Sequence, residues 1–128
     1  MQTTTRATTK QGNAVRRRIE RRCRRLGERR ASRYRRVILS LYMAADADGL
    51  YTNATNIELG SGAGVPASAV GDYLRMAEAD GLVRVFRPGA DCVSCRVVIF
   101  KEHRQARGMI RDHEAYTRST ETLGRRGR

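Results

Sequence analysis

The stretch GSGAGVPASAV, residues 60–70, decides how this chain is interpreted, because two different structures fit it. Three glycines in five positions, followed by small residues, are typical of a loop that wraps around a phosphate group. Small residues and glycine are equally typical of the corner between two closely packed helices. The segments on either side of the stretch distinguish these two interpretations.

The phosphate-loop interpretation lacks the surroundings that such loops need. A Walker loop follows a strand and ends in Gly-Lys-Ser or Gly-Lys-Thr. A dinucleotide-binding loop needs a βαβ unit and an acidic residue about 20 positions downstream. Here the segment before Gly60 has a helical pattern, no lysine follows the glycines, and no parallel βαβ unit can be assembled. The sequence therefore argues against a nucleotide-binding loop.

The helix-turn-helix interpretation explains more of these positions. Two helices that cross at a steep angle need a small residue in the first helix and a glycine at the corner. We expect Gly60 to be the small contact, Gly64 to be the left-handed corner, and Val65 to be buried after it. Gly62 also lies inside the first helix, where a glycine costs about 1 kcal/mol relative to alanine. The inward positions of the second helix are then Val70, Tyr73 and Leu74.

Two helices are predicted before the corner region. The first begins at Asn13, and its arginine-covered surface carries one thin apolar stripe, formed by Val15, Ile19, Cys23 and Leu26. We expect a break at Gly27. A more apolar helix follows within residues 33–45 and stops at residues 46–49.

The corner itself is flanked by short elements. Residues 50–52 are β-prone, and Thr52 or Asn53 can cap the next helix. The inward positions of that helix would be Ile57 and Leu59. Pro66 suits the first turn of the second helix, which stops at residues 80–81.

Two strands and a last helix complete the chain. The strands are expected at residues 82–86 and 92–100, joined by the turn RPGAD. The predicted divisions are a disordered tail at 1–12, an arginine-rich helix at 13–32, a domain at 33–100, a helix at 101–123 and a basic tail at 124–128.

The net charge of +13 is concentrated at the two ends of the chain. Residues 1–36 contain 14 Lys/Arg and two Asp/Glu, whereas residues 37–100 contain four Lys/Arg and seven Asp/Glu. Residues 101–128 contain eight Lys/Arg and four Asp/Glu. Basic ends attract polyanions, because binding releases the counterions condensed on phosphates. We therefore expect a nucleic acid as partner, and a merely solvated arginine-rich helix face is the alternative.

The composition argues against several other classes. No run approaches the roughly 18 apolar residues of a membrane span, and the N-terminus lacks the apolar region of a secretory signal. No Ser-His-Asp arrangement, paired carboxylates or metal triad can be assembled. We expect neither an enzyme nor a cofactor nor membrane association, and place the protein in the cytoplasm, associated with the nucleoid.

Residues 70–86, VGDYLRMAEADGLVRVF, resemble the recognition helix and the start of the wing in bacterial winged helix-turn-helix proteins of the multiple-antibiotic-resistance and GntR types. The resemblance runs from about Arg33 to Phe100. It implies a mainly α fold with a small β-hairpin (α+β), here with an extra helix at each end. It also implies a sequence-specific, double-stranded DNA-binding regulator of transcription. We expect a homodimer through the stripes at 14–30, 102–123 or both.

By this resemblance the helix at 66–80 enters the major groove. The candidate contacts on its outer face are Pro66, Ala67, Ser68, Gly71, Asp72 and Arg75. Further candidates are the wing arginines Arg84, Arg87 and Arg96 and, at the start of the domain, Arg35 and Arg36. The N-terminal arginines expected on phosphates are Arg16, Arg17, Arg18, Arg21, Arg22, Arg24 and Arg25.

The outer face of this helix is poor in base-reading groups, which leaves other functions open. Only Arg75 is a strong donor, and Asp72 repels phosphates unless it is paired or meets a cytosine amino group. A plasmid or phage replication, partition or architectural protein would use the same fold with mainly backbone contacts. A protein-interaction module would instead bind a protein partner through the acidic middle, with the basic ends as tethers.

The pair Cys92 and Cys95 is half of a zinc site at most. Residues three apart on a strand point to opposite faces, which works against chelation. We therefore interpret the pair as small half-buried residues, with a thiol redox switch as the alternative and no metal. The remaining ligands of a zinc site would have to come from Cys23, His103 or His113.

Overall fold

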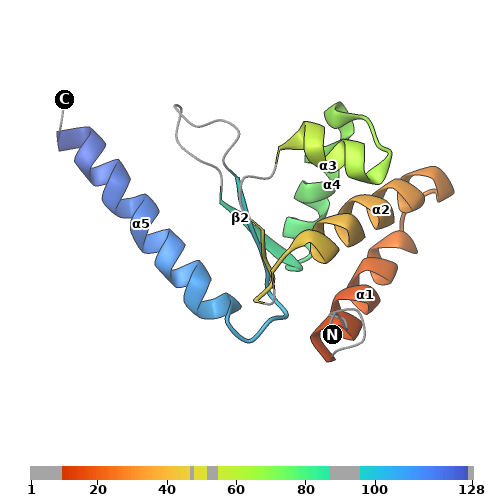
Figure 1. Ribbon diagram of the computed structural model, residues 1–128, viewed down its shortest axis with the longest axis horizontal. Helices are drawn as coiled ribbons and strands as arrows, with labels where there is room; N and C mark the ends of the chain where they lie inside the picture. Colours follow the sequence, from red (N-terminus) through yellow and green to blue (C-terminus); the bar gives the residue numbers. More distant parts are fainter. Residues whose placement is uncertain (1–9, 47, 52–54, 87–95, 127–128) are drawn as a thin grey trace.

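The computed structural model describes residues 10–46, 48–51, 55–86 and 96–126. Within these ranges the chain forms five helices and a three-stranded antiparallel sheet, so the predicted mainly α, α+β class is confirmed (Figure 1). The elements are α1 (Lys10–Cys23), α2 (Glu28–Ala44), β1 (Leu50–Tyr51), α3 (Asn56–Ala63), α4 (Ala67–Ala79), β2 (Val83–Phe86), β3 (Val97–Phe100) and α5 (Ala106–Arg126).

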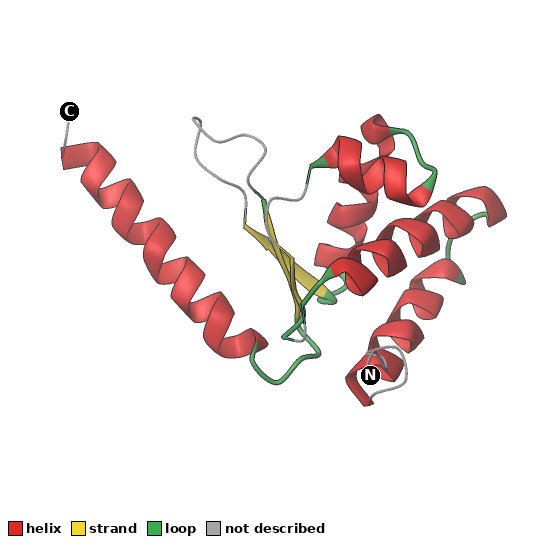
Figure 2. Ribbon diagram, in the orientation of Figure 1, coloured by secondary structure: helices red, strands yellow, loops and turns green. Residues whose placement is uncertain are grey.

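The sheet separates α5 from the other four helices (Figure 2). Its strand order is β1-β3-β2, so β3 is central and both neighbours run antiparallel to it. Val83 and Val85 of β2 are buried in the main core. The alternating residues Arg84 and Phe86 contact α5 on the opposite face, as the two-residue period of a strand requires. One face of β2 therefore packs in the main core, and the other face contacts α5.

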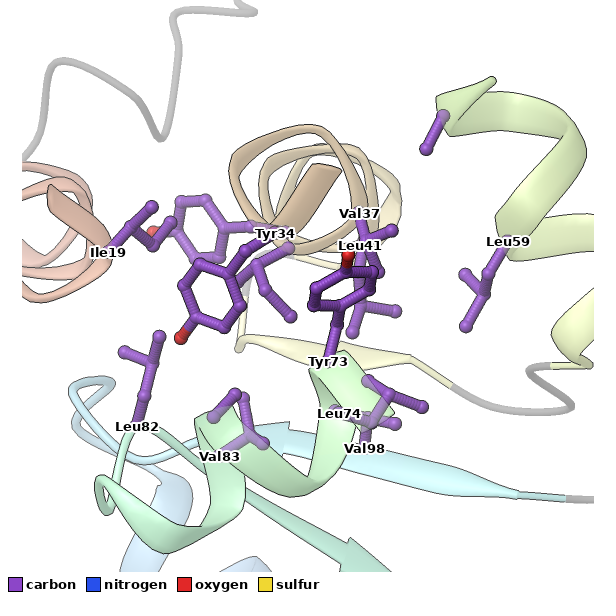
Figure 3. Close-up of a cluster of buried hydrophobic side chains, with 14 of the residues drawn as sticks. Ile19, Tyr34, Val37, Leu41, Leu59, Tyr73, Leu74, Leu82, Val83 and Val98 are labelled. Atoms are coloured by element: carbon purple, nitrogen blue, oxygen red, sulfur yellow. The ribbon is translucent and has the colours of Figure 1, made fainter. Parts of the chain in front are cut away.

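Helix α2 lies at the centre of the core. Side chains of α1, α3, α4 and β3 surround it, and Figure 3 shows this cluster. Because α2 is covered by several elements, apolar residues occupy most of its circumference after Arg36, as expected for a buried helix. Its fully buried side chains are Tyr34, Val37, Ile38, Leu41 and Tyr42.

The apolar stripe of α1 packs against α2 within the same chain. Val15 and Ile19 have no exposed surface, and Cys23 is 6% exposed. The stripe at 14–30 is therefore a core contact, and the stripe at 102–123 is the one left for the predicted dimer. The predicted boundary at residue 32 is wrong, because Gly27 precedes the first turn of α2 at Glu28.

Both ends of the chain depart from the predicted divisions. Lys10 to Gly12 belong to α1, and residues 1–9 lie outside the described part. Helix α5 begins at Ala106, not at Lys101, because the preceding residues are held at the end of the sheet. There the Lys101 N–H donates to the Leu82 carbonyl, and His103 Nε2 lies 2.7 Å from the Tyr42 hydroxyl. α5 then continues to Arg126, through most of the predicted tail.

The predicted glycine corner is confirmed. Gly64 ends α3 in the left-handed conformation with φ 69°, and Val65 after it is buried. A Cβ on Gly60 would lie 2.4 Å from the Val65 carbonyl oxygen, so the two backbones touch at this point. On α4, Val70 and Leu74 have no exposed surface and Tyr73 is 4% exposed. The spacing of these residues therefore identified the packing of α3 on α4.

The start of α3 differs from the prediction. The cap is Thr55, whose Oγ1 accepts a hydrogen bond from the Glu58 N–H at 3.1 Å; Thr52 and Asn53 lie outside the described residues. The cap is thus two or three residues later than predicted, and residues two apart on a helix, such as Ile57 and Leu59, lie on nearly opposite sides of it. Leu59 is buried as expected, but the inward placement of Ile57 is wrong, because this side chain is 74% exposed.

The two glycines of α3 should respond oppositely to alanine. Gly60→Ala is expected to destabilise the fold by about 1–3 kcal/mol, because the new methyl group meets backbone that has little room to move. Gly62→Ala should stabilise it by up to about 1 kcal/mol, since a Cβ there meets nothing within 4 Å. Urea unfolding of both variants measures the difference. Equal effects would show that the contact at Gly60 does not constrain the corner.

Candidate nucleic-acid interface

The outer face of α4 is open to solvent. Pro66, Ser68, Asp72 and Arg75 are exposed, and Ala67 and Gly71 are partly exposed. The inner face is anchored in the core by Val70, Tyr73, Leu74 and Ala77. The predicted candidate residues of this helix therefore lie on one accessible surface, which consists largely of small side chains.

Arg75, the single cation of α4, is already paired. Its guanidinium forms an ion pair with Asp72, one turn earlier on the same exposed face. Glu78 adds a second carboxylate to the helix, and its Oε2 accepts from the Val85 N–H at 3.3 Å. Helix α4 as a whole thus carries more negative than positive charge, and on its outer face Asp72 balances Arg75.

Arg35 and Arg36 serve contacts inside the protein. Arg35 donates through Nε and Nη2 to both carboxylate oxygens of Glu20 on α1, at 2.6 and 2.8 Å. Arg36 Nη1 donates to the carbonyls of Ala63 and Gly64 at 3.3 and 3.4 Å. Arg36 therefore satisfies backbone acceptors at the end of α3, which the helix leaves without intrahelical partners.

Arg84 is turned toward α5. Its Nη1 donates to Glu114 at 2.7 Å, and its guanidinium lies over the Phe86 ring, 4.4 Å from the ring centroid. The His113 ring stacks on Phe86 with centroids 5.2 Å apart. Arg84 thus helps to fasten α5 to the sheet. Arg96 is partly buried next to β3, whereas Arg87 lies outside the described residues.

The arginines of α1 and the following turn divide into two groups. Arg18 donates to Glu102 at 2.6 Å and to the Asp80 carbonyl, and Arg22 pairs with the Asp80 carboxylate through two hydrogen bonds. These two therefore join α1 to the far end of α4. A second group is exposed and makes no ion pair or side-chain hydrogen bond with any described residue: Arg16, Arg17, Arg21, Arg24 and Arg25.

Sequence reasoning missed the acidic partners that divide these arginines. In the sequence Asp80 indicates only a helix stop, and no local pattern pairs Glu20 or Glu102 with a particular arginine. The apolar stripe of α1 was the signal that could have revealed them, because a helix that packs on the core brings its flanking arginines against the chain.

The described cysteine and histidines belong to the structure of the core and its edges. Cys23 Sγ donates to the Ala31 carbonyl at 3.5 Å, and burial raises the pKa of its thiol. Among the residues described, no group of three or more His, Cys, Asp or Glu side chains is placed to hold a metal ion. Cys92 and Cys95 lie outside that part of the chain.

Comparisons of the chain with protein-family models, curated proteins and solved structures gave no match. Across the helical segments that the structure describes, none is both long and apolar enough to span a bilayer. Function is therefore inferred from the charge and geometry described above.

The Glu20–Arg35 pair should make stability depend on acid pH. The hydrogen bonds that the Glu20 carboxylate accepts from Arg35 lower the pKa of Glu20 below its ordinary value of 4.5. A carboxylate of this kind stabilises the fold above the unfolded pKa, and the contribution is lost as pH falls through the lower, folded pKa. Wild type should therefore exceed Glu20→Gln in free energy of unfolding at about pH 7, and the difference should shrink at about pH 3.

Urea unfolding at the two pH values measures this difference. Glu28→Gln is the control, because Glu28 has no ion pair with a described residue. A constant difference between wild type and Glu20→Gln across the range would contradict the pairing.

Proposed function

We propose that the chain is a double-stranded DNA-binding protein of winged helix-turn-helix architecture and that it acts as a small transcriptional regulator. The order of elements carries the proposal. α2, β1, α3, α4, β2 and β3 follow one another, the glycine corner joins α3 to α4, and the sheet order is β1-β3-β2. This arrangement supports the fold implied by the resemblance of residues 33–100.

Helix α4 is the element proposed to enter the major groove. The inner face of α4 is packed in the core, so the helix already has its position relative to the sheet before DNA binds. The small outer residues Ala67, Ser68 and Gly71 allow close approach to base edges. Arg75 can exchange the carboxylate of Asp72 for the two acceptors of a guanine, which it would contact as a bidentate donor.

A protein that contacts mainly the DNA backbone is the second candidate. The Asp72–Arg75 pair favours it, because a cation held by its own helix reads bases weakly. The exposed arginines at and after α1 would then supply most of the affinity through phosphates, as in a replication, partition or architectural protein.

Selection of bound fragments from a genomic library distinguishes the two candidates. The full chain is used at about 0.2 M salt, where backbone contacts alone are weakened. A recovered sequence motif supports the regulator. Recovery without a motif, together with a steep loss of affinity as salt rises, supports the backbone-contact protein. No recovery even at low salt would reject both.

Opposite changes are expected from the two residues of the α4 ion pair. Arg75→Ala should weaken binding to the selected site by about 1–3 kcal/mol while nonspecific binding changes little. Asp72→Asn should strengthen binding to all duplexes, because it releases Arg75 and removes a charge that repels phosphates. Fluorescence anisotropy with matched specific and random duplexes measures both effects. Unchanged affinity in both variants would remove α4 from the interface.

We also propose that the functional unit is a homodimer formed through α5. Of the two stripes predicted for this role, the one on α1 is buried. Helix α5 extends away from the other helices in Figure 1, and Tyr116 on it is 72% exposed.

Sedimentation equilibrium tests the dimer. Wild type should sediment as a dimer and Tyr116→Glu as a monomer, because a carboxylate cannot be buried in an apolar contact without a partner. Ile57→Glu is the matched control, since Ile57 is equally exposed but lies on α3. Loss of the dimer only in Ile57→Glu would show that the dimer contact lies on α3. A monomeric wild type would reject the proposed dimer.

A further inference from the structure

Arginines at the α1 end of the molecule line a cavity of about 220 Å³. Four guanidinium groups meet one carboxylate there, since the lining residues are Arg18, Arg21, Arg22, Arg25 and Asp80. Even with Glu102, which pairs with Arg18 beside the cavity, positive charges outnumber negative ones by two. Such an excess at close range repels itself unless an anion is bound.

Two of these arginines are held in place and two can close on a ligand. Arg22 is fixed by Asp80, and Arg18 by Glu102 and the Asp80 carbonyl, with side chains only 19% and 28% exposed. Each guanidinium has five N–H donors, so both retain donors that these bonds do not use. Arg21 and Arg25 are exposed and make no ion pair with a described residue. Fixed donors beside adaptable ones are well suited to an oxyanion.

A further buried donor lies within electrostatic range of this cluster. The hydroxyl of Tyr34 has no exposed surface and no hydrogen-bond partner among the described atoms. Asp80, Arg22 and Arg18 are among the charges that act on it. Burial raises its pKa, so the hydroxyl stays protonated and adds no negative charge beside the cavity.

The cavity is separate from the surface proposed for the major groove. Asp80 follows the last residue of α4, so the cavity is about 20 Å along the helix from its start at Ala67. It also lies beyond the end of the sheet where Val83 pairs with Phe100.

We infer that this arginine cavity is a second anion site and that it binds a phosphate group. Its volume is below the roughly 300–1,000 Å³ of pockets that enclose a whole drug-sized ligand, so it suits one phosphate group or two joined ones. The phosphate can belong to a nucleic-acid backbone or to a free phosphate compound. The backbone version rests on the proposed DNA binding, whereas the site itself does not.

Titration of the full chain with inorganic pyrophosphate tests the site without DNA. Calorimetry at constant ionic strength compares wild type with Arg21→Gln/Arg25→Gln and with the control Arg17→Gln/Arg24→Gln. Both variants replace one exposed arginine of α1 and one in the following turn, but only the first pair lines the cavity. We expect at least tenfold weaker binding in the first variant and no change in the control. Absent binding to wild type, or equal loss in both variants, overturns the inference.

The salt dependence of duplex binding then identifies the source of the phosphate. If the group belongs to the DNA backbone, Arg21→Gln/Arg25→Gln should lower the salt slope by about 1 more than the control does. If the two variants have equal slopes while pyrophosphate binding differs, the ligand is a free phosphate compound. Failure of the chain to bind any duplex would reject the proposed function but leave the pyrophosphate result standing.

Discussion

The contact between the backbones of α3 and the corner residue Val65 is the constraint on which the candidate interface depends. Only a residue without a Cβ allows the Val65 carbonyl to approach Gly60 as it does. This approach turns α4 so that its apolar positions enter the core while its small residues remain outside. Arg36 supports the same corner from α2 by donating to the carbonyls of Ala63, the last residue of α3, and of Gly64. A looser corner would change which face of α4 is accessible.

Carboxylates decide which of the many arginines remain available for a ligand. Glu20, Asp80 and Glu102 hold arginines of α1 and α2, Asp72 holds Arg75, and Glu114 holds Arg84. The net charge of +13 therefore does not mean that every arginine is available to a ligand. The exposed arginines concentrate at and after α1, whereas α4 carries more negative than positive charge. Strong phosphate binding and base reading are thus proposed for different parts of the molecule.

The packing of α1 on the core determines how the N-terminal arginines can act. A helix whose stripe is buried against α2 cannot act as an independent arm, and Arg18 and Arg22 fix its orientation relative to the end of α4. The positions of its outward arginines are consequently set before any ligand binds. This preorganisation reduces the ordering that binding requires, and it gives the arginine cavity a definite place relative to α4.

The sequence by itself determined the elements whose cause is local. Gly64 at a left-handed corner, the buried residues around it and the stops near Gly49 and Gly81 could be predicted, because backbone conformation and helical period depend on neighbours in the chain. The tertiary structure alone decided the rest: the burial of the α1 stripe, the exposure of Ile57 and the partner of each arginine. The acidic partner of an arginine can be far away in sequence, as Glu102 is from Arg18. Only the packing of the helices brings the two side chains within hydrogen-bond distance.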